Sequence, residues 1–395
     1  MAHPTIEQIA ELGPYLADHS SHADALGRLP DDTGKLLKET GVVRMLQPRD
    51  FGGLEADPRD FLNAVMDIGN YCPSAGWTAG VVGVHPWELA LNDTRLQEEV
   101  WGDDPDTWVA SPYAPSGVAT PTDGGFIVNG RWSFSSGTDL CDWIVLGAMV
   151  KAASAGPDDP PIGSLHVMLP RADYEIVEDS WNTIGLEGTG SKDVIVDGKF
   201  VPDYRTLDVR KLLDGRAAKE SVRSGDPLFN VPWSAVFPGG VAAGLIGIAE
   251  GVLQRGIEYQ AGRVSNLGVV QADDPHSRRV LGEAAAEIAS ARIQLVHNIG
   301  EAYDAVRAGH TIGIDQRVAL RRDQVRAAWR AAEAANTVYD ICGGNAIRLD
   351  KPVQRFWRGM HAGLHHGIFL RGPLLDLAGG VLMGLPPTGP SAVTI

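Results

Sequence analysis

The stretch Gly125-Phe126-Ile127-Val128-Asn129-Gly130-Arg131-Trp132-Ser133-Phe134-Ser135-Ser136-Gly137 decides the class of fold that the sequence predicts. It starts as an apolar run, passes through the turn-forming pair Asn129-Gly130, and continues as a second run that ends in two hydroxyls and a glycine. Short runs bounded by turn formers are typical of β-strands. We therefore expect two strands here, with a turn between them.

Further short apolar runs occupy the region from Ser111 to about Leu207, at 143–146, 165–169 and 194–196. Turn formers or loop residues separate these runs, at 122–125, 155–161 and 196–198. No helical crossover fits between them, and parallel strands need such crossovers. The pattern favours an antiparallel barrel or sandwich over a Rossmann sheet.

Helical periodicity flanks this region on both sides. Apolar residues recur at intervals of three and four from Ile6 to about Trp101, and long Ala- and Arg-rich periods follow Ala235, for example at 277–308 and 315–342. The segment 30–33 marks a helix start at which Asp or Thr can accept the first free N–H groups, and 50–53 predicts a loop.

The predicted fold class is therefore α+β. We expect an N-terminal helical domain at 1–108, a central antiparallel β-barrel or sandwich domain at 109–210, and a C-terminal bundle of about four helices at 211–395.

Composition excludes several functional classes. The chain has 395 residues, 44% of them hydrophobic, and a formal net charge of −16, which argues against nucleic acid as a partner. Its three isolated cysteines, and an N-terminus with neither a basic nor an apolar region, favour the cytoplasm over secretion. Two apolar stretches, 232–249 and 377–395, are interrupted by Gly and Pro, so we expect a buried bundle helix and a C-terminal tail, with no continuous membrane-spanning helix.

Two glycine-containing segments carry hydroxyls. Ser135 and Ser136 stand at a predicted strand end, where a hydroxyl can hydrogen-bond a ring nitrogen of a cofactor or can simply cap the next turn. The loop 185–191 combines three glycines with Thr189 and Ser191, and its free N–H donors would suit a phosphate or a flavin edge. It lacks the context of a Rossmann fingerprint, and a plain tight loop is the alternative.

Histidines and arginines form the remaining candidates. His85 lies in an apolar helical neighbourhood near Trp77, where a buried and satisfied histidine is the commoner explanation. In the stretch 355–366, Arg358 and His366 would lie about two turns apart on one helix, a spacing that suits a single cleft, although an interface is also compatible. His361 and His365 have metal-compatible spacing, but no nearby Asp, Glu or Cys completes a site, so we expect no metal.

Taken in order, these features resemble the acyl-CoA dehydrogenase-like flavin proteins over essentially the whole chain. Within that superfamily the chain is similar to the oxygenase components of two-component flavin-dependent monooxygenases, including secosteroid-phenol hydroxylases and p-hydroxyphenylacetate hydroxylases. The resemblance is carried by 41–48, 51–53, Gly76-Trp77, 82–85, 111–115, 132–137, 185–191 and 355–366. The chain departs from those relatives at Glu187, where they usually have Arg, and at Gly359, where they usually have Asp. The tail after His366 also differs.

The resemblance implies an enzyme that receives reduced flavin, FADH2 or FMNH2, from a partner reductase. It implies that O2 then gives a C4a-hydroperoxide, which hydroxylates a small aromatic substrate, a phenol or an indole-like ring. A homotetramer is also implied.

The resemblance also assigns residues. His366, Ser111 and His85 would be catalytic, on the substrate side of the flavin ring. Ser135 would contact flavin N5, and further cofactor contacts would come from Trp132, Ser136, Gly188, Thr189, Ser191 and Arg358. Arg263 would reach the flavin phosphates of a neighbouring subunit.

Two alternatives have different chemistry. An acyl-CoA dehydrogenase needs a carboxylate base, but residues 353–375 contain no Asp or Glu, so that function would need a displaced base such as Glu250. A non-catalytic scaffold would bind no flavin. Imidazole, with an ordinary pKa near 6.5, suits the exchange of a phenolic proton and favours hydroxylation.

Overall fold

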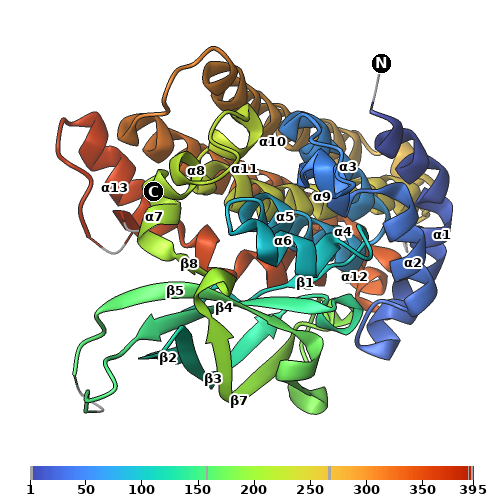
Figure 1. Cartoon of the computed structure of the whole chain (residues 1–395). Helices are drawn as coiled ribbons and strands as arrows, with labels where there is room; N and C mark the ends of the chain where they lie inside the picture. Colours follow the sequence, from blue (N-terminus) through green and yellow to red (C-terminus); the bar gives the residue numbers. More distant parts are fainter. Residues whose placement is uncertain (1–2, 157–158, 266–267, 390, 393–394) are drawn as a thin grey trace.

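The computed structural model describes the chain except for residues 1–2, 157–158, 266–267, 390 and 393–394. A helical layer lies on one side of a β-sheet, which forms the lower part of the molecule in Figure 1. Helices precede and follow the strands in the chain, so the predicted fold class is confirmed. The domain boundaries at 108 and 210 stay predictions.

The N-terminal helices are α1 (Pro4–Leu26), α2 (Asp31–Thr40), α3 (Pro58–Tyr71), α4 (Pro73–Val82), α5 (His85–Leu89) and α6 (Thr94–Trp101). Helix α2 starts where the sequence predicts, but its N-cap is Pro30, which offers no side-chain acceptor. The predicted Asp or Thr cap is therefore wrong. Asp31 and Asp32 instead occupy the first turn, where negative charge stabilises the helix dipole.

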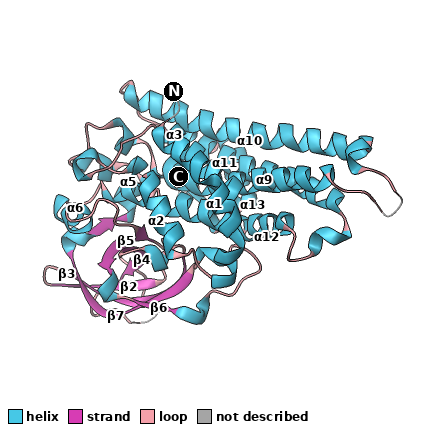
Figure 2. Cartoon of the chain, turned by 90° about the vertical axis from the view of Figure 1, so that its right-hand side faces the viewer, coloured by secondary structure: helices cyan, strands magenta, loops and turns pink. Residues whose placement is uncertain are grey.

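Eight strands form one sheet in the order β6-β7-β3-β2-β4-β5-β8, with β1 paired to β4. The strands are β1 (Val109–Ala110), β2 (Gly117–Thr122), β3 (Gly125–Ser135), β4 (Trp143–Val150), β5 (Gly163–Pro170), β6 (Glu175–Val177), β7 (Lys192–Pro202) and β8 (Thr206–Asp208). Five pairings are antiparallel, but β1 and β2 each run parallel to β4. The sheet is therefore mixed, whereas the sequence predicts an antiparallel one. Strand β3 runs opposite to β2, and β4 reverses again and so runs parallel to β2 on its other side. Figure 2 shows the strands gathered at one end of the molecule.

The two predicted turns at Asn129-Gly130 and Asp197-Gly198 are wrong. Strands β3 and β7 run through both pairs, and their register shifts between Val128 and Gly130. The Asn129 side chain accepts a hydrogen bond of 2.7 Å from the backbone N–H of Gly198, whose φ is +60°. Asn129 and Gly130 therefore form a β-bulge within β3, a feature in which glycine is common.

The remaining helices are α7 (Val209–Leu213), α8 (Arg216–Glu220), α9 (Trp233–Ala261), α10 (Pro275–Arg307), α11 (Ile314–Cys342), α12 (Pro352–Leu364) and α13 (Arg371–Leu382). Helix α9 lies at the centre and packs against α3, α4, α10, α11 and α12. A Cβ at Gly247 would lie 2.2 Å from the carbonyl oxygen of Met66, so glycine allows α9 and α3 to touch backbone to backbone.

Helix α9 is continuous through Pro238, so the predicted interruption there is wrong. Proline in the second turn removes a single backbone hydrogen bond, which extensive packing can offset. Among the described residues, α9 alone is long and apolar enough to cross a membrane, but 89% of its apolar window is buried inside the protein. The prediction of a buried bundle helix is confirmed. The second stretch, 377–395, lies partly outside the described residues; its described part ends α13 at Leu382 and continues without a helix long enough to span a membrane.

Candidate active site

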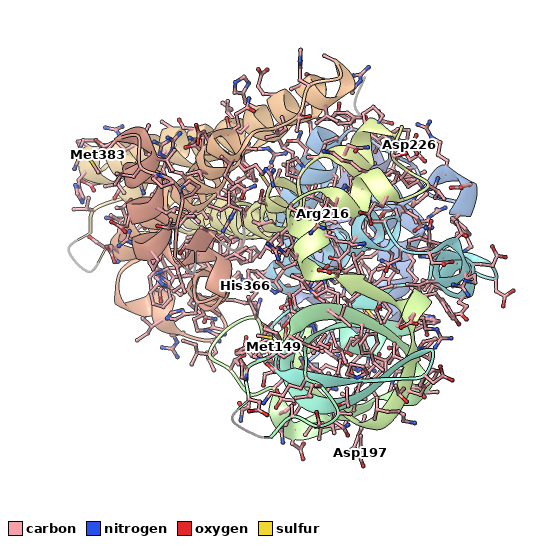
Figure 3. The ribbon with its side chains drawn as sticks, turned by 60° about the vertical axis from the view of Figure 1, so that its left-hand side comes forward. Met149, Asp197, Arg216, Asp226, His366 and Met383 are labelled. Atoms are coloured by element: carbon pink, nitrogen blue, oxygen red, sulfur yellow. The ribbon has the colours of Figure 1, made fainter. Side chains whose placement is uncertain are left out.

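His366 lies just beyond the helix that was expected to contain it. Helix α12 ends at Leu364, and His366 adopts an extended conformation that caps the short turn 367–369. Arg358 and His366 therefore do not share a helix face, contrary to the prediction. Figure 3 shows His366 where the helical part meets the sheet that carries Met149 of β4.

Aromatic rings surround His366 on several sides. The ring centroids of Trp77, Phe237 and Phe369 lie 5.9, 6.3 and 6.4 Å from that of His366. Desolvation, assisted by the positive charge of Arg321, lowers the pKa of His366 to about 4. His366 is therefore neutral at neutral pH.

The backbone fixes the tautomer of His366. Its Nδ1 lies 3.2 Å from the N–H of Ile368, which can only donate. Nδ1 must accept this hydrogen bond, so in the neutral ring the proton is on Nε2. His366 is thus a donor at Nε2.

His85, at the start of α5, has the opposite arrangement. Its Nδ1 lies 2.5 Å from the carbonyl oxygen of Val109, so Nδ1 carries the proton and donates. Its Nε2 is buried and has no hydrogen-bond partner among the described residues. Burial lowers the pKa of His85 to about 4. The predicted satisfied histidine is therefore satisfied at one nitrogen and is a free acceptor at the other.

Two rings that the sequence did not single out connect these histidines. The Tyr113 centroid lies 5.5 Å from that of His85 and 4.7 Å from that of Phe237, which in turn contacts His366. Ser111 is buried, and it lies two residues before Tyr113 and two after Val109 in the chain. We call His85, Tyr113, Phe237, His366 and Trp77 the aromatic cluster. Of the three predicted catalytic residues, the structure brings His85 and His366 together in this cluster, and the contribution of Ser111 stays a prediction.

A buried ion pair supports Tyr113. Glu88 and His166 approach to 2.5 Å, and Tyr113 stacks on His166 with centroids 4.5 Å apart. Burial alone would raise the pKa of Glu88, but the charge and hydrogen bond of His166 outweigh it and lower that pKa. Burial and the charge of Glu88 raise the pKa of Tyr113 well above its ordinary value. Sequence gave no signal for this pair, because its members are 78 positions apart.

The predicted cofactor hydroxyls fall into two groups. Ser135 is fully buried, and its Oγ has no hydrogen-bond partner among the described residues. In contrast, Ser136 Oγ accepts from the indole of Trp77 at 3.2 Å and lies 2.8 Å from Ser191 Oγ, which lies 2.7 Å from Thr189 Oγ1. A buried, unpaired hydroxyl fits a ring nitrogen of a bound flavin, so Ser135 is the better candidate for that contact.

In the loop 185–191, the N–H groups of residues 188–190 are paired within the chain and are not the free donors that the sequence predicts. The Gly188 N–H donates to Asp24, the Thr189 N–H to the carbonyl of Leu186 and the Gly190 N–H to that of Glu187. The bonds of Thr189 and Gly190 close the 3-10 turn at residues 187–189, and the bond of Gly188 ties the loop to α1. Gly188, Thr189 and Ser191 therefore shape the loop, and their contacts with a flavin stay a prediction.

Trp132 lies in β3 and packs within the sheet. It is fully buried, its indole N–H donates to the carbonyl of Gly147 at 2.7 Å, and its ring fills the space beside Gly117. The structure thus gives Trp132 a core position. The neighbouring Phe134 has φ +70° and is 68% exposed, and such strain at a non-glycine residue is frequent beside functional sites.

Arg358 holds the loop to α12. It pairs with Glu187 at 2.5 Å, donates to Gln354 at 2.7 Å and also contacts the carbonyl of Ile184. The departure at Glu187 is therefore compensated by Arg358 of the same chain. A Cβ on Gly359 would lie 3.2 Å from Pro73, so its absence relieves a tight contact.

Arg263 caps the end of α11. Its Nη1 donates to the carbonyls of Ile341 and Cys342 at 2.9 and 2.7 Å. Its contact with a flavin of a neighbouring subunit stays a prediction. His361 bonds Asn336 at 2.7 Å, which supports a structural role for that histidine.

Glu250, the displaced base of the dehydrogenase alternative, is engaged elsewhere. Arg292 pairs with Glu250 at 3.0 Å and with Asp67 at 2.8 Å, between α9, α10 and α3. Thirteen residues separate Glu250 from Phe237 along α9, about 20 Å of helical rise. Glu250 is not in a position to act beside the aromatic cluster.

Comparisons with known proteins agree with this geometry. The family model "Acyl-CoA dehydrogenase, C-terminal domain" matches residues 240–370. The chain is 48% identical to a pigment production hydroxylase of Rhodococcus erythropolis, over 99% of each chain. It is 38% identical to the flavin-dependent monooxygenase oxygenase subunit HsaA of Rhodococcus jostii, over 91% of this chain and 93% of HsaA.

A crystal structure of the HsaA monooxygenase from M. tuberculosis superposes with a TM-score of 0.92 and 36% identity, covering 99% of both chains. The resemblance inferred from the sequence is thereby confirmed. The chain belongs to the oxygenase components of the two-component flavin-dependent monooxygenases, built on the acyl-CoA dehydrogenase-like fold.

Proposed function

We propose that this oxygenase component hydroxylates a phenol whose oxygen is held between His85 and His366. The observation that carries the proposal is the opposite polarity of two neutral histidines on one aromatic cluster. His85 offers a free acceptor at Nε2, and His366 offers a donor at Nε2. A phenol both donates and accepts, so it can satisfy both.

The roles of the side chains follow from this polarity. His85 Nε2 accepts the phenolic proton, while His366 Nε2–H donates to the oxygen and stabilises the charge that develops there. The buried Ser111, two residues before Tyr113, would add a hydroxyl on the substrate side. The rings of Tyr113, Phe237 and Trp77 align the substrate and exclude water. This assignment makes His85 the base and His366 the hydrogen-bond donor.

A bound reduced flavin would supply the two electrons that activate O2, and one atom of that O2 enters the ring. The phenol, O2 and reduced flavin then give a catechol, water and oxidised flavin, with the other oxygen atom leaving as water. The buried Ser135 hydroxyl would hold a ring-nitrogen proton of the flavin, and a partner reductase supplies the reduced flavin. The location is proposed as cytoplasmic and the assembly as a homotetramer.

The experiment supplies chemically reduced FAD or FMN with O2 and a panel of phenols and indoles, and measures hydroxylated product and hydrogen peroxide. Product from at least one phenol is expected. Reduced flavin that yields only peroxide with every phenol would contradict the proposal.

An indole-like substrate is the second candidate, and the two histidines distinguish it. An indole N–H can only donate, so it needs His85 and gains nothing from His366. His366→Phe would therefore lower turnover of a phenol and spare that of an indole. Equal loss for both substrates would remove the donor role of His366.

A further inference from the structure

Helix α11 carries a buried arginine, Arg321, that forms no ion pair with any carboxylate of the described residues. Its side chain belongs to a residue that is only 4% exposed. Burial is the one influence on its pKa, which falls to about 10, and no negative charge opposes that fall. Arginine is almost never fully buried without a paired anion. A buried charge that the fold keeps at such a cost needs a physical explanation.

The nearby acidic residues of α11 are paired with other arginines. Asp323, two residues after Arg321, lies 2.7 Å from Arg322. Glu333 lies 2.8 Å from Arg326. Arg321 therefore stays a cation without a counter-ion among the described residues.

The hydrogen bonds of Arg321 tie α11 to two other parts of the chain. Its Nη2 donates to the carbonyl of Ile368 at 2.8 Å, in the turn 367–369. Its Nη1 donates to Gln324 Oε1 at 2.7 Å, and Gln324 donates to the carbonyl of Ala235 in α9 at 3.0 Å. The Nε atom is buried and has no partner in the described part of the chain.

The turn 367–369 is the element that holds His366. The N–H of Ile368 bonds His366 Nδ1 at 3.2 Å, and the carbonyl of the same residue accepts from Arg321. Trp329 donates to the next carbonyl, that of Phe369, at 3.0 Å. Helix α11 thus anchors this turn twice, once through a cation and once through a neutral indole.

The bond from Ile368 requires His366 to be neutral. A proton on Nδ1 would set two N–H groups against each other and release the ring from the turn. Aromatic rings face His366 from α4, α9 and the turn, namely Trp77, Phe237 and Phe369. The adjacent His365 is exposed. Arg321, from α11, is the charged group that acts on His366.

We propose that Arg321 is a positioning residue of the hydroxylation: it anchors the turn that holds His366, and its uncompensated charge keeps a second proton off that ring. The Nε2–H of His366 then meets the phenol oxygen in a single orientation. This inference rests on the proposed function, because it assumes the donor role of His366.

The test separates the charge of Arg321 from its hydrogen bonds. Arg321→Met removes both, whereas Arg321→Lys keeps the charge and loses the planar fork. Trp329→Phe removes the neutral anchor of the same turn. Arg317→Met is the matched control, because Arg317 lies one turn earlier on α11 and donates to the carbonyls of Leu213 and Ile395, away from the turn.

The pH dependence of kcat for a phenol is the first measurement. Arg321→Met should move the acid-side decline upward by about one pH unit, because a like charge that opposes protonation is gone while desolvation remains. Arg321→Lys and Trp329→Phe should lower kcat about tenfold without moving the decline, since each loses a hydrogen bond to the turn. Arg317→Met should change neither. Adding His366→Asn to Arg321→Met should abolish the shift.

Nuclear magnetic resonance of protein labelled in its histidine rings gives a measurement that needs no turnover. The His366 signals are those that disappear in His366→Asn. In the wild type His366 should carry a proton on Nε2 alone down to about pH 5, whereas in Arg321→Met it should gain a second proton at higher pH. If Arg321→Met does not fold, Arg321→Gln, which keeps a donor and lacks the charge, takes its place.

An unchanged pH profile and an unchanged titration of His366 in Arg321→Met would overturn the inference. A shift of equal size in Trp329→Phe or Arg317→Met would also overturn it, because the charge would not be the cause. A shifted titration of His366 without hydroxylation of any phenol would support the effect of Arg321 on His366 and contradict the proposed function. Hydroxylation that requires His366 but has one pH profile in every Arg321 variant would support the function and contradict the inference.

Discussion

The aromatic cluster and the loop 185–191 differ in how their buried polar groups are satisfied. In the loop, the N–H groups of Gly188, Thr189 and Gly190 and the hydroxyl of Ser191 all have partners in the chain. In contrast, His85 Nε2 in the cluster, Trp233 Nε1 beside Phe237 and Ser135 Oγ at the end of β3 are buried and have no partner among the described residues. Because an unpaired buried polar atom is costly, the second region is where the fold leaves capacity for ligands.

The largest expected effect is on His85, whose free nitrogen defines the cluster. His85→Ala should lower kcat for a phenol about 10²- to 10⁴-fold, the range typical of a lost general base. Product formation with chemically reduced flavin measures this, and circular dichroism checks folding. A loss smaller than that of His366→Ala would reverse the assignment of base and donor.

The buried pair beneath Tyr113 should control stability. His166→Ala leaves the Glu88 carboxylate buried without its partner, which should cost about 3 kcal/mol of unfolding free energy. Urea unfolding measures it. Adding Glu88→Leu to His166→Ala should recover part of the loss, because it removes the stranded charge. A double variant that is less stable than His166→Ala would show that the unpartnered Glu88 carboxylate is not the cause of the loss.

Ser135 and Ser136 offer the most direct contrast between an unpaired and a paired hydroxyl. Ser135→Ala should leave stability almost unchanged and increase peroxide release per reduced flavin consumed, by about tenfold for a lost hydrogen bond to a charged or developing group. Ser136→Ala should instead cost about 1 kcal/mol of stability by breaking its contacts with Trp77 and Ser191. Peroxide assays and thermal unfolding on both variants measure the difference. Equal peroxide release per reduced flavin in Ser135→Ala and Ser136→Ala would contradict this contrast.

The smallest expected effect is on pH dependence near neutrality. The pKa values of His85 and His366 are lowered to about 4, so both stay neutral well below pH 6.5. Between pH 6.5 and 4 the unfolded chain binds more protons at these sites than the folded chain, so stability should fall as the pH falls through this range. Turnover should show no step near pH 6.5 and should decline toward pH 4. A step near 6.5 that persists in His365→Asn and disappears in His366→Asn would show that His366 titrates normally.

Much of the fold follows from local patterns. Helices α10 and α11 were expected at 277–308 and 315–342 and run at Pro275–Arg307 and Ile314–Cys342. The turn predicted at Asn129-Gly130 is wrong, because the same residue types suit both a tight turn and a β-bulge. Only pairing with the neighbouring strand β7 decides between the two. The helix expected through His366 ends two residues early, since nothing local distinguishes Leu364 from its neighbours.

The sequence by itself determined the order of helices, strands and helices, the lack of a carboxylate at 353–375 and the positions of His85, Ser135 and His366 in the chain. Those features depend on neighbours in sequence, through periodicity, propensity and residue type. Only the tertiary structure decided which hydroxyl is left unpaired, that Glu88 meets His166, and which ring nitrogen of each histidine carries the proton. Each of these depends on a hydrogen-bond partner fixed by the fold, such as the carbonyl of Val109 for His85 and the N–H of Ile368 for His366.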